Sequence, residues 1–250
     1  SYTNGLTSDN SLGYNLYYLA DPYLEMLKKG ELPMASVDAK ARNILRLIFR
    51  TSLNQNKPYG SLCTKEHYDV AKVIGDESIV LLRNNGILPL QADKYNRILV
   101  VGDNAVRRLT DGGGSSELKP KDMISPLDAL RALYGDKIEY TQGYACGRPF
   151  FGYEEEMQQT VIDSLRVEAV AKARQADVVI YVGGLNKNAF QDCESTDRKS
   201  YNLPFSQNEL IEELVAVNPN LVIANISGNA YAMPWLKKVP AILHLSLIHI

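Results

Sequence analysis

The sequence predicts an α/β fold in which a mostly parallel sheet is sandwiched by helices. From residue 96 onward, short continuous runs of Val, Ile and Leu alternate with longer amphipathic segments. Continuous apolar runs are typical of strands buried on both faces, as in a parallel sheet covered by helices. With 250 residues, of which 45% are hydrophobic and 22% charged, the chain is long and apolar enough to bury such a core.

Two helices are expected before this α/β region. The first covers residues 22–29, where Leu24 and Leu27 share one side and Gly30 provides a C-terminal stop. The second helix has Ser36 as its N-cap. Its apolar side follows the i, i+3, i+4, i+7 pattern and would pack on something not fully present in this chain: Ala41, Ile44, Leu45 and Ile48.

The next stretch, residues 53–66, predicts a linker, because it is rich in polar residues, Pro and Gly and has little periodicity. A third helix is expected from about residue 65 to 83. Asn84-Asn85-Gly86 would end it, since Asn and Gly tolerate the left-handed conformation that closes a helix. Residues 67–250 would then form the α/β domain.

The apolar runs and amphipathic segments alternate in the order that a parallel sheet requires. Strands are expected at 98–101, 138–141, 177–182, 221–226 and 239–243, and helices at 126–133, 154–174 and 206–217. Ligands of such sheets bind at the carboxyl ends of the strands. Three segments after strands are therefore candidates for function: residues 103–120, 183–204 and 227–234.

Composition excludes several classes of protein. A formal net charge of -2 argues against a nucleic-acid-binding surface, which needs a basic excess. No apolar run approaches the roughly 20 residues of a membrane span. The three cysteines, Cys63, Cys146 and Cys193, are far apart and match no zinc spacing, so free thiols are expected. The three histidines form no recognisable metal or catalytic set.

A glycine-rich segment, residues 111–116, follows the first strand of the sheet. Successive glycines either let a backbone approach a ligand closely or make a tight exposed turn, and the sequence alone favours the turn. No Gly-Lys-Ser/Thr follows, so this is not a phosphate loop. The alternative interpretation as a nucleotide-binding domain is supported only by Val100-Val101-Gly102.

Residues 191–199 carry three carboxylates and two cations. Such a cluster is usually a solvated surface, but a loop that follows a parallel strand is a favoured place for function. A neighbouring Asp192 or Asp197 would raise the pKa of Glu194, whereas Arg198 would lower it. The sequence leaves open which effect dominates.

Several segments resemble glycoside hydrolase family 3, in the order in which that family has them. Asp76-Glu-Ser-Ile-Val-Leu-Leu-Arg-Asn-Asn-Gly-Ile-Leu-Pro-Leu90 is similar to the segment that opens the family's second domain. The other similar segments lie at 37–50, 112–130, 176–184 and 225–236. The resemblance covers roughly residues 30–244, and the combination is more specific than any one segment.

The resemblance implies a domain plan. Residues 1–52 would be the C-terminal end of a truncated (β/α)8 barrel of the TIM type, 53–66 a linker, and 67–250 the family's α/β sandwich domain, truncated at its C-terminus. Residues 245–250 depart from the family and suggest a cut or foreign end. In the family the barrel supplies an Asp nucleophile from a Ser-Asp-Trp-like motif. No such motif is present, so the nucleophile is expected outside this chain.

The resemblance also implies site residues. The family's acid/base often lies in a loop written Gly-Glu-Gly-Tyr-Asp-Arg, and Cys193-Glu-Ser-Thr-Asp-Arg198 has Glu, Asp and Arg at the matching positions. Glu194 is therefore the expected acid/base, and Asp197 and Arg198 are expected to hold the loop by ion pairing. The residues expected to bind substrate or position loops are Asp192, Asp197, Arg198, Gly113, Gly114, Ser115 and Ser116. No metal or organic cofactor is implied.

The function implied is hydrolysis of terminal β-linked glucosyl or xylosyl residues by a retaining two-carboxylate mechanism. The partner would be a β-glucoside, a β-xyloside or an oligosaccharide, and the location periplasmic or secreted. The sequence leaves open the preferred sugar and the oligomeric state. The alternative is a catalytically silent α/β module that binds a small ligand.

Overall fold

The computed structural model describes residues 19–109, 120–147, 152–154, 157–193 and 196–246. The chain divides into two compact units, Ser1–Leu62 and Cys63–Ile250, and each is described by itself.

The described residues of the first unit, from 19 to 62, form the helices α1 (Asp21–Lys28) and α2 (Ala35–Arg50). They are joined by a hydrogen bond of 2.6 Å between the hydroxyls of Tyr23 and Ser36. The prediction that Ser36 caps α2 is wrong, because the helix begins two residues earlier than expected, with Met34 at the N-cap. The Ser36 hydroxyl is bonded to Tyr23 instead. The apolar side expected of α2 is exposed in this unit at Ile44, Leu45 and Ile48.

The second unit opens with helix α3 (Lys65–Ser78) and strand β1 (Val80–Asn84). A capping box starts the helix: Thr64 Oγ1 accepts from His67 N at 3.3 Å, and His67 Nδ1 accepts from Thr64 N at 3.4 Å. The prediction of one helix to residue 83 is wrong. Val80 and the residues after it leave the helix because they pair as an edge strand of the sheet.

The sheet has six strands in the order β1-β6-β5-β4-β2-β3. The strands β2 to β6 are Ile98–Val101, Ile138–Thr141, Val178–Gly184, Leu221–Ile226 and Ala241–Leu245. All neighbours among these five strands pair in parallel, whereas β1 runs antiparallel to β6. The predicted mostly parallel sheet is therefore confirmed.

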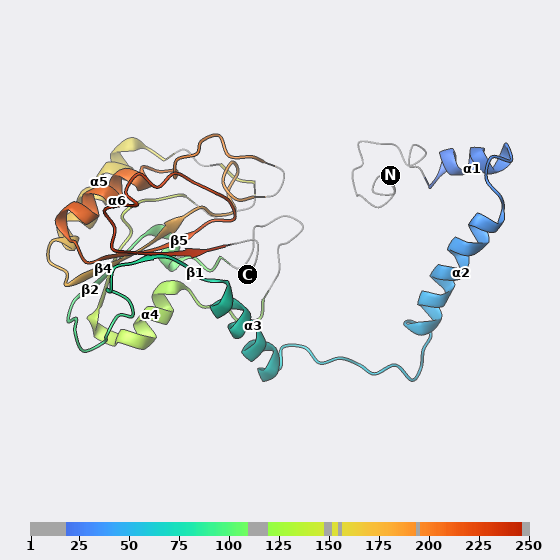
Figure 1. Cartoon of the computed structure of the whole chain (residues 1–250), viewed down its shortest axis with the longest axis horizontal. Helices are drawn as coiled ribbons and strands as arrows, with labels where there is room; N and C mark the ends of the chain where they lie inside the picture. The colour runs from blue at the N-terminus through green and yellow to red at the C-terminus, as the bar shows by residue number, and fades with distance from the viewer. Residues whose placement is uncertain (1–18, 110–119, 148–151, 155–156, 194–195, 247–250) are drawn as a thin grey trace. The chain divides into compact units, whose positions relative to one another are not determined.

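Helices cover both faces of this sheet. Figure 1 shows α5 (Gln159–Ala173) and α6 (Gln207–Val217) on one face and α4 (Pro126–Tyr134) on the other. Helix α5 begins later than residue 154, the start expected from the sequence, because Gln158 has an extended backbone. Two short 3-10 helices, η3 (Asp103–Val106) and η5 (Gly135–Lys137), follow β2 and α4.

The two faces have separate apolar cores. The core under α5 and α6 contains Tyr181, Leu210 and Trp235, whose indole N–H donates to Asn208 Oδ1 at 2.9 Å. The core under α4 contains Ile98, Val100, Leu127, Val178 and Ile180. Residues on β2 and β4 alternate between the two cores, as the pleat of a strand requires. Both faces of these strands are thus buried, which explains their continuous apolar runs.

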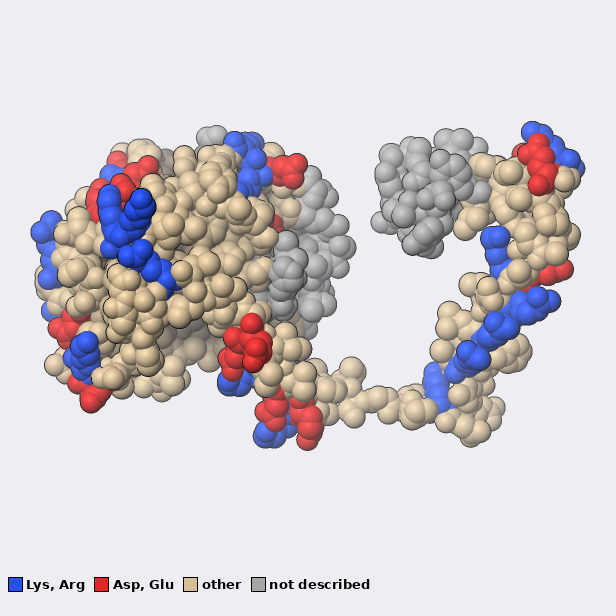
Figure 2. Space-filling view, viewed as in Figure 1, with Lys and Arg blue, Asp and Glu red and all other residues tan. Residues whose placement is uncertain are grey.

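Acidic and basic side chains lie next to one another on the surface of the second unit that Figure 2 presents, rather than gathering by sign. The ion pairs of the second unit include Lys238–Glu212, at 3.0 Å. No helix among the described residues is long and apolar enough to span a membrane.

Candidate active site

The loops that leave the carboxyl ends of the parallel strands meet at one edge of the sheet. The loop after β2 begins with a turn at Gly102, whose φ is +134° and whose missing Cβ would lie 1.9 Å from Val182 O of β4. Only glycine fits a backbone approach this close. The loop after β2 therefore leaves the sheet in contact with the backbone of β4.

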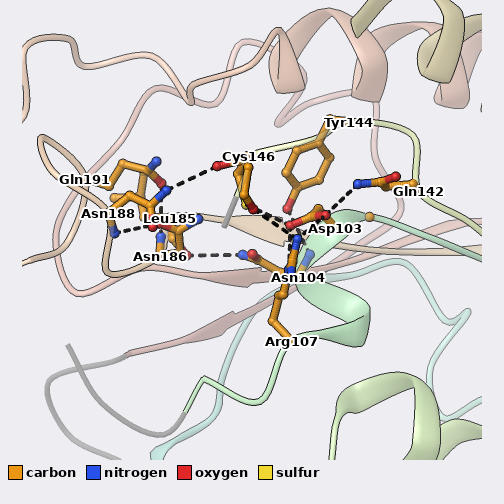
Figure 3. Close-up of polar contacts among 12 residues, drawn as sticks. Asp103, Asn104, Arg107, Gln142, Tyr144, Cys146, Leu185, Asn186, Asn188 and Gln191 are labelled. Atoms are coloured by element: carbon orange, nitrogen blue, oxygen red, sulfur yellow. Dashed lines mark hydrogen bonds and ion pairs between the residues drawn. The ribbon is translucent and has the colours of Figure 1, made fainter. Parts of the chain in front are cut away.

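A buried carboxylate, Asp103, joins the loops after β2 and β3. It is fully buried and accepts two hydrogen bonds from Arg107, at 2.8 and 3.0 Å. Gln142 Nε2 and the Cys146 thiol each donate to it at 2.7 Å (Figure 3). Burial raises the pKa of the Cys146 thiol, and the Asp103 carboxylate raises it further, so the sulfur stays protonated and donates. Asp103 has partners on both oxygens, which suits a structural role.

A second set of contacts joins these loops to the loop after β4. Asn104 Nδ2 donates to Leu185 O at 3.1 Å, and Asn188 Nδ2 donates to Cys146 O at 3.1 Å (Figure 3). Tyr144, which is buried, accepts from the backbone N–H of Asn104 at 3.3 Å. The three loops thus form one hydrogen-bonded layer above the strand ends.

The last residue of β4, Gly184, is held by a side chain from α6. Gln207 Oε1 accepts from Gly184 N at 2.8 Å and from the Tyr181 hydroxyl at 2.6 Å, and Gln207 Nε2 donates to Gly184 O at 2.8 Å. All three residues are buried. The amide of Gln207 therefore fixes the point at which the loop with the predicted acid/base leaves the sheet.

Buried amides give the first part of that loop its path. The backbone N–H of Asn186 donates to Gln191 Oε1 at 3.1 Å, and Asn186 Oδ1 accepts from Asn188 N at 2.8 Å. The backbone N–H of Asp192 donates back to Asn186 O at 2.9 Å. Residues 186–192 consequently form a compact turn that is closed by hydrogen bonds between its own residues.

The predicted acid/base and the predicted glycine-rich residues lie outside the described part of the chain: Glu194, Gly113, Gly114, Ser115 and Ser116. The described residues beside Glu194 are close together. Cys193 Sγ lies 2.7 Å from Thr196 Oγ1, and Thr196 Oγ1 also accepts from Phe190 N at 3.0 Å.

The structure places the other predicted site residues on both sides of position 194. Asp192 Oδ1 accepts from Asn229 Nδ2 at 2.6 Å, and Oδ2 accepts from Gly228 N. Arg198 donates to Ala230 O. Among the residues that the structure describes, no ion pair joins the exposed Asp197 to Arg198, so Arg198 is attached through a backbone carbonyl.

The environment of Asp192 acts on its carboxyl group in two directions. Burial raises the pKa of Asp192 above its ordinary value, while the N–H of Gly228 and the charges of Arg198 and His244 favour the ionised form. His244, on β6, has a pKa lowered by burial and raised in part by Asp192. The carboxylate is therefore retained at a half-buried position by specific donors.

A cavity of about 340 Å³ lies beside the same loop. Its lining includes Phe190, Phe205 and Lys199, whose Nζ lies 3.5 Å from the centre of the Phe190 ring and 3.1 Å from Glu154. An aromatic ring beside an ion pair suits a ligand with both an apolar face and hydroxyl groups. No group of three His, Cys, Asp or Glu within the described ranges is arranged to hold a metal ion.

Sequence reasoning missed several residues that build this edge: Asp103, Gln142, Asn186, Gln207 and the segment 228–230. The signal for three of them was present, because Asp103, Asn186 and 228–230 lie in segments that follow a buried strand. Gln142 and Gln207 gave no such signal, since each is recognised only by the buried partner it meets in space.

Residues 79–248 match the model of the glycosyl hydrolase family 3 C-terminal domain. Because the match covers more than half of the chain and the sheet has the expected architecture, the chain belongs to glycosyl hydrolase family 3. The resemblance found in the sequence is thereby confirmed.

Individual relatives cover nearly all of this chain. A beta-glucosidase of Bacteroides ovatus is 55% identical over 248 residues, which are 97% of this chain and 33% of that protein. An exo-alpha-(1->6)-L-arabinopyranosidase of Bifidobacterium breve is 30% identical, over 92% of this chain and 30% of its own length. The solved structure of a Bifidobacterium adolescentis beta-glucosidase is 29% identical with a TM-score of 0.71, covering 90% of this chain and 31% of that one. This chain therefore spans about a third of the length of these relatives.

Proposed function

We propose that the complete protein hydrolyses terminal β-linked glucosyl or xylosyl residues by the retaining mechanism, and that this chain supplies the acid/base, Glu194, but not the nucleophile. The observation that carries the proposal is the loop 193–198. It belongs to a family 3 domain, has Glu, Asp and Arg at the positions of the family's acid/base motif, and leaves the carboxyl end of β4.

In the retaining mechanism a carboxylate nucleophile attacks the anomeric carbon while a carboxylic acid protonates the departing oxygen. The same acid then takes a proton from the water that releases the sugar. The two carboxyl groups must stand about 5–5.5 Å apart. Glu194 would be the acid, and a residue beyond this chain would be the nucleophile.

The test replaces Glu194 with Ala in the complete protein. With an aryl β-glucoside of poor leaving ability, kcat/KM is expected to fall by roughly 10²–10⁴-fold, the usual contribution of general acid catalysis. With the 2,4-dinitrophenyl β-glucoside, whose leaving group departs without a proton, azide should restore turnover and give a β-glucosyl azide, because the small anion replaces the water that no longer has a base. Glu209→Ala, which removes an exposed carboxylate of α6, serves as the control. Unchanged turnover in Glu194→Ala would refute the assignment.

The chain of 250 residues alone is expected not to turn over an aryl β-glucoside, because a retaining site needs both carboxylates. The cavity beside Phe190 favours the alternative function, a silent ligand-binding module. Calorimetric titration of the complete protein with glucose, together with a turnover assay, separates the two functions. Binding without any glycoside hydrolysis would favour the silent module.

A further inference from the structure

Both flanks of the acid/base loop are attached to the same short segment, residues 228–230. On the N-terminal side, the carboxylate of Asp192 accepts one hydrogen bond from Gly228 N and one, of 2.6 Å, from Asn229 Nδ2. On the C-terminal side, the guanidinium of Arg198 donates to Ala230 O. Position 194 therefore lies between two attachments that meet on one piece of backbone.

That segment is itself attached to the sheet. Ser227, which is buried, donates its backbone N–H to Leu245 O of β6 at 2.9 Å. Its hydroxyl donates to Asn229 O at 2.5 Å and accepts from Asn229 N at 3.3 Å, closing a tight turn. Ala232 N donates to Tyr201 O at 2.8 Å, which fixes the far end of the segment. Residues 228–230 thus transmit the position of β5 and β6 to the loop.

The chemistry at Asp192 requires an ionised carboxylate. Gly228 N and Asn229 Nδ2 are both donors, and an ionised carboxylate is an acceptor on both oxygens. Charge-assisted hydrogen bonds of this kind are about twice as strong as neutral ones. If an amide replaced the carboxylate, its NH2 group, which is a donor, would face one of these two donors, and that hydrogen bond would be lost. The other titratable or charged groups that act on Asp192 are Arg198 and His244.

We infer that Asp192 is a positioning residue, whose carboxylate fixes the acid/base loop to residues 228–230 so that residue 194 faces the glycosidic oxygen. This inference rests on the proposed function. Asp192 does not itself exchange a proton with the substrate; it sets where the acid stands. A misplaced acid weakens protonation of the leaving group and leaves nucleophilic attack intact.

The leaving group therefore distinguishes positioning from a merely structural role. Departure of 2,4-dinitrophenolate needs no proton, whereas departure of an alcohol or phenol of high pKa does. In the complete protein, Asp192→Asn is expected to lower kcat/KM for a phenyl β-glycoside by at least about tenfold, equal to 1.4 kcal/mol of transition-state stabilisation. For the dinitrophenyl β-glycoside the loss should stay below about twofold, since kcat/KM reports the glycosylation step.

Three further variants complete the experiment. Asn229→Ala removes one donor to Asp192 and leaves the carboxylate, so kcat/KM for the phenyl β-glycoside should fall by a smaller factor than in Asp192→Asn. This variant also provides the test if Asp192→Asn does not fold. Asp192→Glu, which keeps the charge, should recover part of the phenyl glycoside activity. Asp136→Asn, which replaces an exposed aspartate before β3, should leave kcat/KM unchanged for both substrates.

The outcomes separate this inference from the proposed function. An equal loss on both substrates in Asp192→Asn and Asn229→Ala would overturn the positioning role while leaving the acid/base assignment standing. Full activity in Glu194→Ala would overturn the assignment itself. A loss confined to the phenyl glycoside, with partial recovery in Asp192→Glu, supports positioning.

Discussion

Replacing Gln207 with Leu tests whether the loop that carries the proposed acid/base depends on the amide that holds the end of β4. The substitution leaves three buried groups without their partner: the Tyr181 hydroxyl and the backbone N–H and C=O of Gly184. Each unsatisfied buried group costs about 1–3 kcal/mol, and local relaxation favours the lower end of that range. The free energy required to open the end of β4 should therefore fall by about 3–5 kcal/mol.

Hydrogen exchange followed by mass spectrometry measures this loss in the complete protein. The amide of Leu185 donates to Ile226 O at 2.8 Å and reports opening at the end of β4. A loss of about 3 kcal/mol accelerates exchange roughly a hundredfold, since 1.36 kcal/mol corresponds to a factor of ten. Tyr181→Phe is the matched control, because it removes one donor and leaves both bonds between Gln207 and Gly184 in place. It should accelerate exchange only about fivefold, as for the loss of about 1 kcal/mol.

The reasoning would be refuted if the peptide that contains Gly184 and Leu185 exchanged at the wild-type rate in Gln207→Leu. That result would mean that the loop after β4 is held by other contacts, such as the bond between Asn104 and Leu185 O. No effect of Gln207→Leu on the proposed catalysis would then be expected.

Two further predictions concern ionisation. The backbone N–H groups of Arg97 and Asn96 hold the pKa of Asp177 below its ordinary value, so the ionised side chain stabilises the fold above about pH 4, and this stability is lost as the pH falls through the lowered pKa. Asp177→Asn should therefore lower the melting temperature at pH 7 and approach the wild type near pH 3; a constant difference across this range would contradict the assignment. Iodoacetamide at pH 8 should modify the exposed Cys63 and spare Cys146, whose pKa is raised by burial and by Asp103; equal labelling in peptide mass spectra would contradict the buried thiol.

The sequence was a reliable guide to strands wherever an apolar run is buried on both faces. Residues 98–101 and 221–226 were predicted with the bounds that β2 and β5 have. Residues 138–141 were also predicted with the bounds of β3, although this edge strand is only half-buried along most of its length. Strand β6 begins two residues later than expected, since Pro240, which has no N–H to donate, precedes the paired residues. Burial on both faces is a property of the strand itself, so the pattern appears locally in the sequence.

Strand β1 was missed for the opposite reason. Val80, Leu81 and Leu82 continue an apolar pattern that begins in α3, and short apolar runs do not distinguish a helix from a strand. Pairing with β6, which lies about 160 residues further along the chain, decides the conformation. The sequence carries no local record of that partner, and the helix was therefore extended too far.

The buried polar layer was only half predictable. The segments that hold Asp103 and Asn186 were identified because each follows a buried strand. The partners of these loops were not identified, because they are distant in the sequence. The Cys146 thiol that donates to Asp103 lies 43 residues further along the chain, and Gln207, which binds Gly184, lies 23 residues beyond it. Cys146 was expected to be a free thiol, which it is, but its role as a hydrogen-bond donor depends on the carboxylate opposite.

The charged residues around position 194 illustrate why composition alone could not assign their roles. In the sequence they form one cluster of three carboxylates and two cations, whose effects on the pKa of Glu194 oppose each other. In the structure Asp192 turns to Gly228 and Asn229, and Lys199 turns to Glu154. The N–H of Gly228 and the charge of Arg198 already stabilise the negative charge of Asp192. Asp192 should therefore raise the pKa of a neighbouring carboxyl less than an isolated carboxylate would. If Glu194 is the acid/base, as proposed, the charged residues around it should act chiefly through geometry, which is the quantity that the leaving-group comparison measures.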